Sequence, residues 1–247
     1  MKTLHILKAG SKLPSLAKKP GDFHDWIIDG MQMQPDVVKI IDVRRGDHLP
    51  ELKDVSGIVI TGSSSMVTDH EQWSELTAVW LKNAVQNHIP VLAICYGHQL
   101  LAHALGGEVA DNPAGVEVGT VDTTLTSDSQ DDVLLRGLSS PLKVQASHKQ
   151  SVKQLPVHAV RLASSAMDKN HAFRVGANAW GLQFHPEFDA EITQHYVDYY
   201  RPSLKSQGVN AEQLMRHCKD SGVGSLILKR FYQYCSQALV SQQSGSD

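Results

Sequence analysis

The sequence predicts an α/β protein built around a mixed, mainly parallel sheet, and two observations point to it. Over the first hundred residues, short β-branched runs alternate with helical patterns, which is typical of βα units and parallel strands. After Gly107, short strands follow one another with few helices between them. This change indicates antiparallel strands on or beside the main sheet.

The expected elements follow in chain order. The parallel part has strands at residues 3–7, 37–43, 57–61 and 91–94, with a helix at 73–87 before the last of these. That helix carries apolar residues at helical spacing, among them Leu76 and Trp80, and it ends before Pro90. Later strands are expected at 118–125, 142–146, 159–164, 171–175 and 179–184, followed by helices over 190–240 and a frayed end at 241–247.

Composition narrows the class of protein. The chain has 247 residues, 41% hydrophobic and 20% charged, with a net charge of −3, which suits one large domain with a buried core. The weak charge and the lack of a basic run give no reason to expect a nucleic-acid partner. No apolar stretch approaches the ~18 residues that cross a membrane, and the first residues lack the apolar core of a signal peptide. We therefore expect a cytoplasmic protein without a membrane partner.

The cysteines fit the same setting. Cys95, Cys218 and Cys235 have wide, unmatched spacings that suit neither a disulfide framework nor a zinc motif, so no metal site is expected. A reducing cytoplasm keeps such thiols free, and a free thiol can act as a nucleophile.

Cys95 stands on a corner between a strand and a helix. The buried run 91–94 ends at Cys95, and a helical pattern starts near Gly97, as in the G-x-S-x-G corner that exposes a nucleophile. The amino end of the helix favours a thiolate, and the N–H of Tyr96 could stabilise an oxyanion. From this stretch alone, Cys95 is equally well interpreted as a nucleophile or as a small buried hydrophobic residue.

A thiol nucleophile needs a base, and His185 is the candidate. An apolar strand ends there in His185-Pro186-Glu187, where proline fixes the backbone and Glu187 can reach back to the imidazole. Cys95, His185 and Glu187 would then form a nucleophile–base–carboxylate triad. Taken alone, the His-Pro-Glu segment is more simply interpreted as a surface turn.

Taken together, these segments resemble the class I (triad) glutamine amidotransferases, which join C-x-G-x-Q to a distant H-x-E. Further matches appear in the family's order: a glycine loop at 60–65, the end of the nucleophile helix at 104–107, G-x-E-x-G at 115–119, and Ser147-His148. The resemblance covers about residues 3–189. Two departures stand out, since Ala93 replaces a glycine, and Gly62-Ser63-Ser64 replaces the family's Gly-Gly-Pro.

The resemblance implies a fold, a domain organisation and a site. The fold would be a three-layer sandwich, with a glutamine amidotransferase domain at 1–202 and a helical extension at 203–247 packed on it. The implied site comprises the triad Cys95, His185 and Glu187, the oxyanion-hole residues Tyr96, Gly62 and Ser63, and the substrate-binding residues Gln99, Ser147 and His148.

The implied activity is release of ammonia from glutamine through a γ-glutamyl thioester on the cysteine. The pattern is most similar to stand-alone relatives of the GMP synthase glutaminase domain. The chain has neither a Walker-type loop nor an S-G-G-x-D-S loop, so we expect no ATP and no cofactor, and any ammonia acceptor would be a separate protein. Two alternatives stay open: a γ-glutamyl peptidase-like hydrolase, and a catalytically silent binding domain, against which the intact triad argues.

Overall fold

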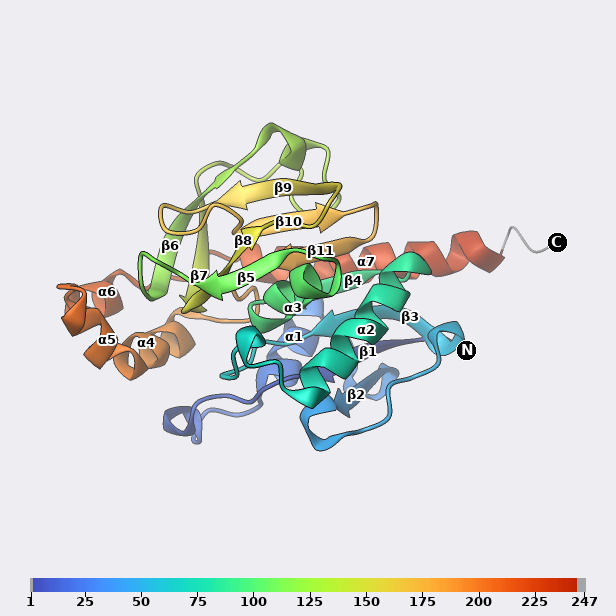
Figure 1. Ribbon diagram of the computed structural model, residues 1–247, viewed down its shortest axis with the longest axis horizontal. Helices are drawn as coiled ribbons and strands as arrows, with labels where there is room; N and C mark the ends of the chain where they lie inside the picture. Colours follow the sequence, from blue (N-terminus) through green and yellow to red (C-terminus); the bar gives the residue numbers. More distant parts are fainter. Residues whose placement is uncertain (1, 244–247) are drawn as a thin grey trace.

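The computed structural model describes residues 2–243 and contains a nine-stranded sheet and a separate strand pair (Figure 1). The order in the large sheet is β2-β1-β3-β4-β11-β10-β9-β6-β7. Its strands are β1 Thr3–Lys8, β2 Val38–Asp42, β3 Val55–Ile60, β4 Val91–Ile94, β6 Glu117–Leu125, β7 Leu142–His148, β9 Ala159–Ser164, β10 Ala172–Val175 and β11 Ala179–Leu182. The separate pair is β5 Glu108–Asp111 and β8 Gln150–Gln154.

The sheet is mixed, as the sequence predicts. Strands β2, β1, β3, β4 and β11 run parallel to one another, whereas β10, β9, β6 and β7 are paired antiparallel. Strand β11 is the last strand among the described residues, yet it lies beside β4 in the middle of the sheet. The ends of β4 and β11 therefore meet at one edge, although about ninety residues separate them in the sequence.

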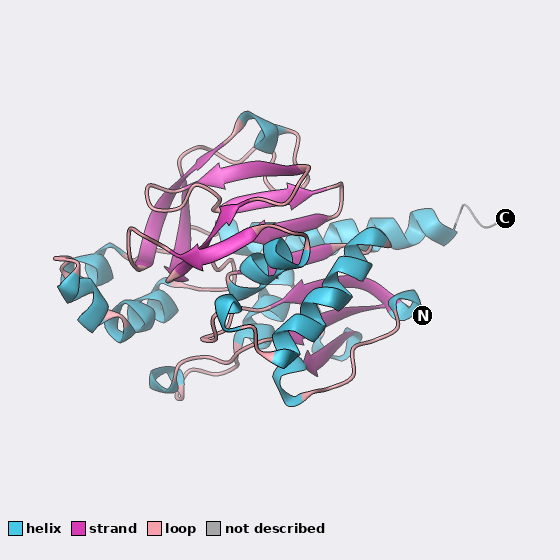
Figure 2. Cartoon of the chain, in the orientation of Figure 1, coloured by secondary structure: helices cyan, strands magenta, loops and turns pink. Residues whose placement is uncertain are grey.

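Helices cover both faces of the sheet (Figures 1 and 2). Helices α1 Phe23–Met31 and α7 Val223–Gln243 pack together on one face, and α2 Gln72–Gln86 and α3 Tyr96–Ala104 pack together on the other. Helices α4 Ala190–Tyr199, α5 Arg201–Ser206 and α6 Ala211–His217 gather beside β6 and β7. Short 3-10 turns connect these elements: η1 Pro14–Leu16, η2 Pro35–Val37, η3 Val43–Arg45, η4 Leu52–Asp54, η5 Val67–Asp69 and η6 Ser127–Gln130.

Strand alternation divides the core between the two faces. Ile6 and Leu7 are adjacent in β1 and fully buried, but Ile6 joins the cluster under α1 and α7, whereas Leu7 joins the cluster under α2 and α3. Both faces of the central strands are thus covered, and the predicted three-layer sandwich is confirmed. Within the described residues, the structure contains no helix of the length and apolarity that a membrane crossing requires.

Some elements were not predicted. Helix α1 begins at a capping box in which Asp22 is the N-cap and Asp25 reaches back to its N–H, a short polar signal that the apolar pattern does not reveal. Strands β5 and β8 are four and five residues long and pair only with each other. Such short pairs depend on tertiary packing more than on local sequence.

Helix α7, which lies beyond the predicted domain boundary, contributes side chains to the main core. In α7, Ile227, Leu228 and Phe231 are fully buried against the sheet, so this helix belongs to one of the three layers. The domain boundary after residue 202 stays a prediction. Of the end expected to fray, residues 241–243 are helical, and residues 244–247 lie outside the described part of the chain.

Candidate active site

Cys95 lies at the tight corner between β4 and α3. Its φ and ψ of 50° and −101° are unusual for a residue with a side chain, and its N–H donates to the carbonyl of Leu182 at 2.8 Å. A Cβ on Gly97 would lie 2.7 Å from the carbonyl oxygen of Ile60, so only glycine lets the helix pass this close to β3. Strain of this kind is typical of nucleophile corners.

His185 reaches the thiol because β11 runs parallel to β4. Leu182 lies opposite Ile94 in this pairing, so Cys95 and His185 follow the ends of two adjacent strands. The N–H of His185 donates to the carbonyl of Gln145 on β7 at 2.8 Å, which fixes the turn, and the imidazole lies close enough to the Cys95 sulfur to interact with it.

Glu187 completes the group by binding the far side of the imidazole. Its Oε1 accepts from Nδ1 of His185 at 2.8 Å, and the two side chains are only 0% and 3% exposed. Burial lowers the pKa of His185, but the negative charge of Glu187 and the neighbouring Cys95 sulfur outweigh it and raise that pKa to about 10. The imidazole is therefore charged at neutral pH and can donate a proton.

Aromatic rings hold this imidazole in place. Phe188 stacks on His185 with ring centres 3.9 Å apart, and Tyr196 of α4 stacks on Phe188 at 4.9 Å. The sequence interpretation missed both residues. The signal was Phe188 directly after the His-Pro-Glu segment, where an apolar side chain would be unusual for a surface turn.

The loop after β3 lies against the thiol and the imidazole. A Cβ on Gly62 would be 2.8 Å from Cε1 of His185 and 3.7 Å from Cβ of Cys95, so a side chain here would collide with the imidazole. The hydroxyl of Thr61 accepts from the N–H of Ala9 and donates to the carbonyl of Gly62, both at 3.0 Å. These bonds hold the peptide between Gly62 and Ser63 in one orientation.

Tyr96 follows Cys95 as the first residue of α3, where the backbone N–H has no acceptor within the helix. Its ring lies away from this N–H in the core between α2 and α3, and its hydroxyl is 2.6 Å from that of Ser74. Burial raises the pKa of Tyr96 to about 12, so the hydroxyl stays neutral. The side chain therefore anchors the start of α3, while the N–H stays at the corner.

The resemblance assigns substrate binding to Gln99, Ser147 and His148, which lie along one side of the site and are called its wall below. The carbonyl oxygen of Ser147 lies 3.6 Å from the Cys95 sulfur. Nε2 of Gln99 donates to the carbonyl of Gln150 at 2.8 Å and to Oε1 of Gln183 at 3.0 Å, and this side chain is buried. Gln99 thus ties the nucleophile helix to the strand after Ser147.

His148 belongs to a buried ionic group that the sequence interpretation did not identify. Its Nε2 lies 2.8 Å from Oε2 of Glu117, and its Nδ1 lies 2.9 Å from the carbonyl of Gln150. Burial raises the pKa of Glu117, but hydrogen bonds with His148 and His171 outweigh it and hold that pKa well below its ordinary value. The register of β6 and β7 places Glu117 directly opposite His148, which explains how the G-x-E-x-G and Ser-His segments meet.

The start of α7 supports the His-Pro-Glu turn from behind. A Cβ on Gly224 would collide with the carbonyl oxygen of Pro186, so the helix packs directly on this backbone. The carboxylate of Asp220, just before α7, accepts from the N–H of Ala190 at 2.7 Å. Residues beyond the predicted domain boundary therefore position the turn that carries His185 and Glu187.

A thiol on a strained corner, an imidazole charged by its neighbours and a buried carboxylate are the groups that thiol-dependent acyl transfer requires. They meet at the carboxyl edge of an α/β sheet, where such folds place their sites. The geometry is therefore compatible with an acyl-transfer enzyme that uses a thiol nucleophile.

Comparison with known proteins identifies the family. The sequence model for the family described as "Glutamine amidotransferase class-I" matches residues 30–198. A subunit of the glutamine-hydrolysing GMP synthase from Archaeoglobus fulgidus is 35% identical over 158 residues, which cover 60% of this chain and 78% of the relative. The chain belongs to the class I glutamine amidotransferases, and it is an enzyme of that family.

Other relatives differ in length and in name. The glutamine-hydrolysing GMP synthase of Porphyromonas gingivalis is 39% identical over 144 residues, which are 57% of this chain but only 27% of that protein. Gamma-glutamyl peptidase 3 of Arabidopsis thaliana is 29% identical over 171 residues, 67% of either chain. A glutamine amidotransferase structure from Methylobacillus flagellatus has a TM-score of 0.75 at 24% identity, covering 96% of this chain and 95% of that one, and it supports the fold alone.

Proposed function

We propose that this enzyme cleaves the γ-amide bond of glutamine or of a closely related γ-glutamyl amide, with Cys95 as the nucleophile. The observation that carries the proposal is the meeting of Cys95, at the end of β4, with the His185–Glu187 pair, after the end of β11. These two segments lie far apart in the sequence and are brought together only by the sheet.

The reaction would begin with attack of the Cys95 sulfur on the γ-carbonyl carbon. The carbonyl oxygen becomes an oxyanion, which the N–H groups of Tyr96 and of the Gly62–Ser63 loop would stabilise. His185 then donates its proton to the departing nitrogen, and ammonia or an amine leaves a γ-glutamyl thioester. Water, deprotonated by His185, then attacks the thioester carbonyl, so that glutamate forms and Cys95 leaves as a thiolate beside the again charged imidazole.

The loop geometry supports an oxyanion hole that is formed without a partner. A trans peptide points its carbonyl and its N–H in opposite directions, and the carbonyl of Gly62 is bound to the Thr61 hydroxyl. A loop with this carbonyl turned toward the thiol would need that hydrogen bond to break. We therefore propose that the isolated chain is active.

Substrate binding is assigned to the wall that contains Gln99, Ser147 and His148. Ser147 lies closest to the thiol, through its carbonyl, and would contact the substrate beside the reacting carbon. Gln99 and His148 both hold the backbone of Gln150, so they would shape the wall rather than release their hydrogen bonds to the ligand.

Two substrate classes, glutamine and γ-glutamyl dipeptides, are both candidates, and relatives named for each exist. The name of the Archaeoglobus relative makes it one subunit of a glutamine-hydrolysing synthase, which favours glutamine here and a separate protein that accepts the ammonia. The Arabidopsis relative is named a gamma-glutamyl peptidase, which favours γ-glutamyl dipeptides. The free thiols Cys95, Cys218 and Cys235 suit a reducing compartment such as the cytoplasm in either case.

The deciding experiment is a release assay on the purified protein without any partner. Ammonia from glutamine and free amino acid from several γ-glutamyl dipeptides are measured under the same conditions, with Cys95→Ala as the inactive reference. Faster release from glutamine supports the glutaminase, and faster release from dipeptides supports the peptidase-like hydrolase. A folded protein that cleaves neither and forms no adduct with a glutamine-like electrophile would instead support the silent binding domain.

A further inference from the structure

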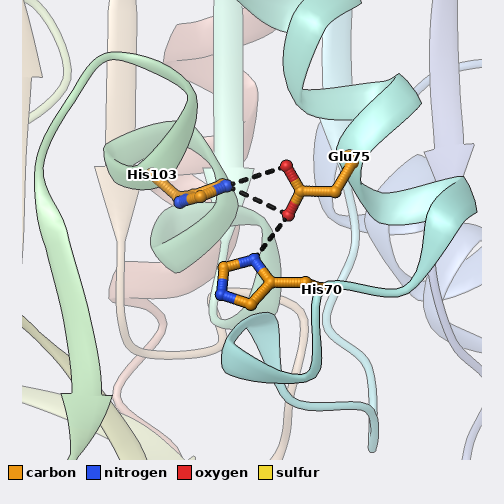
Figure 3. A group of neighbouring side chains, drawn as sticks. All are labelled: His70, Glu75 and His103. Carbon is orange, nitrogen blue, oxygen red and sulfur yellow. Dashed lines mark hydrogen bonds and ion pairs between the residues drawn. The ribbon is translucent and has the colours of Figure 1, made fainter.

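A group of side chains at the other end of α3 takes no part in the proposed reaction. His70 follows η5, Glu75 is in the first turn of α2, and His103 is in the last turn of α3. Figure 3 shows both imidazoles turned toward the carboxylate of Glu75. Nδ1 of His70 is 2.8 Å from Oε1, and Nε2 of His103 is 3.1 Å from both carboxylate oxygens.

We propose that this cluster binds one transition-metal ion, with Zn²⁺ as the best candidate. Two imidazole nitrogens and one carboxylate are a ligand set that zinc uses, with water in the fourth position. Tetrahedral zinc with bonds of about 2.1 Å needs ligand atoms roughly 3.4 Å apart. The three ligand atoms lie within 4.8 Å of one another, so small side-chain movements bring them to this geometry.

The surroundings suit a cation that enters from solvent. The side chains of His70, Glu75 and His103 are 61%, 40% and 28% exposed, so an ion can reach all three. Hydrogen bonds from the two histidines lower the pKa of Glu75, so its carboxylate is charged at neutral pH. The carboxyl end of α3 adds partial negative charge beside His103.

A second group, Glu117, His148 and His171, has the same ligand types but is almost fully buried. Its three side chains are buried, so an ion could reach it only if the surrounding structure opened. The surface cluster is therefore the one open to exchange with free ions.

An ion bound at the surface cluster would join three segments of the chain. It would link α2 to α3 and fix the loop that carries His70. Ser74, next to Glu75, contacts the hydroxyl of Tyr96 at 2.6 Å, so the bound ion would also brace the helix that starts at Cys95. Because the folded cluster binds the ion and the unfolded chain does not hold it together, binding should raise the melting temperature.

The test uses untagged protein carrying Cys95→Ala in every arm, because a free thiolate also binds zinc. Protein stripped with EDTA and exchanged into metal-free buffer is titrated with Zn²⁺ by calorimetry, and thermal unfolding is followed with and without the ion. Co²⁺ serves as a spectroscopic substitute, and Mg²⁺, which prefers oxygen ligands, as a negative control. The expected result is one Zn²⁺ per chain and a rise of about 5 °C at a hundredfold excess over Kd.

Matched variants locate the ion. His103→Ala and Glu75→Gln should each weaken binding at least about tenfold and so reduce the rise in melting temperature to about half or less at the same Zn²⁺ concentration. His48→Ala, a change at another exposed histidine, should alter neither. The proposal is wrong if the stripped protein binds no zinc. It is equally wrong if stoichiometric binding survives in both cluster variants, and loss of that binding in His171→Ala would then place the ion in the buried group.

Discussion

The two ends of helix α3 carry similar chemical groups in opposite surroundings. At its amino end, Cys95 contacts a His185–Glu187 pair whose side chains are 3% and 0% exposed. At its carboxyl end, His103 shares Glu75 with His70, and that Glu75–His70 pair is 40% and 61% exposed. The nitrogen–oxygen distance is 2.8 Å in both the His185–Glu187 and the His70–Glu75 pair.

The difference shows what burial does to the same hydrogen bond. Away from water, opposite charges interact strongly enough to outweigh the desolvation of His185 and raise its pKa to about 10. At the surface, water screens the charges, and an exposed pair contributes roughly 0–1 kcal/mol to stability. The buried end is thus suited to moving a proton, and the exposed end to binding an ion from solvent.

The largest expected effect is loss of the buried thiol or imidazole. Cys95→Ala and His185→Ala should each lower kcat/KM for γ-glutamyl amide cleavage at least about 10⁴-fold, because members of a cooperating set fail together. The measurement is ammonia or amino-acid release, with circular dichroism to verify folding. Cys218→Ala is the matched control and should stay active, so normal turnover by Cys95→Ala would refute the triad.

Glu187→Gln keeps the shape of the triad and removes one charge. Turnover should fall about a thousandfold, because the amide no longer stabilises the charged imidazole. The alkaline limb of the pH–rate profile should move to lower pH in this variant, because Glu187 raises the pKa of His185. An unchanged alkaline limb would mean that Glu187 does not control His185.

The raised pKa of His185 also makes the stability of the fold depend on pH. Because the pKa of folded His185 is raised, its contribution is complete below the unfolded value of about 6.5 and is lost as pH rises through about 10. The melting-temperature difference between native enzyme and Glu187→Gln should therefore be largest near pH 6.5 and shrink toward pH 10. A difference that grows over this range would contradict the assignment.

The buried pair of Glu117 and His148 takes no part in the proposed reaction, so we expect its loss to lower the stability of the fold. Glu117→Gln leaves His148 without its buried carboxylate partner, and breaking such a pair costs about 3 kcal/mol or more. Thermal unfolding should show a melting temperature lower by about 6 °C or more. Glu108→Gln, at an exposed carboxylate, is the control. A cost as small as that of the control would show that burial does not strengthen this pair.

Much of the site at the buried amino end of α3 could be predicted from the sequence, because short local patterns mark its residues. The corner at Cys95 and the His-Pro-Glu segment are short patterns, and the parallel pairing of β4 with β11 brings them together. Helix α1 and the support from Gly224 could not be predicted in this way. Gly224 meets Pro186 only after α7 has packed across the sheet, and nothing in the neighbouring sequence encodes that contact.

The surface end was missed for a similar reason. His70 and His103 stand thirty-three residues apart, in a turn and a helix, without the short spacing that marks a zinc motif. Packing of α2 against α3 brings them to one carboxylate. Glu117 and His148 were identified only as members of separate motifs, since the antiparallel register that pairs them is a property of the sheet.

Gly224→Ala tests how far the buried end depends on the last helix. The added methyl group collides with the carbonyl of Pro186 and must displace either α7 or the His-Pro-Glu turn. A small displacement of His185 should lower kcat about tenfold with little change in KM. Ser225→Ala, at an exposed position on the same helix, should leave kcat unchanged. Equal activity in both variants would show that α7 packs on the turn without positioning it.

The smallest expected effect is at the exposed end. In EDTA, Glu75→Gln removes the charge that both His70 and His103 contact, yet all three side chains are more than a quarter exposed and their interactions are screened. The loss of stability should stay below about 1 kcal/mol, or roughly 3 °C in melting temperature, and should shrink further in high salt. Thermal unfolding of native enzyme and variant at low and high salt measures this. A loss in EDTA as large as that of Glu117→Gln would break the comparison, because an exposed carboxylate would then stabilise the fold as strongly as a buried one without any metal.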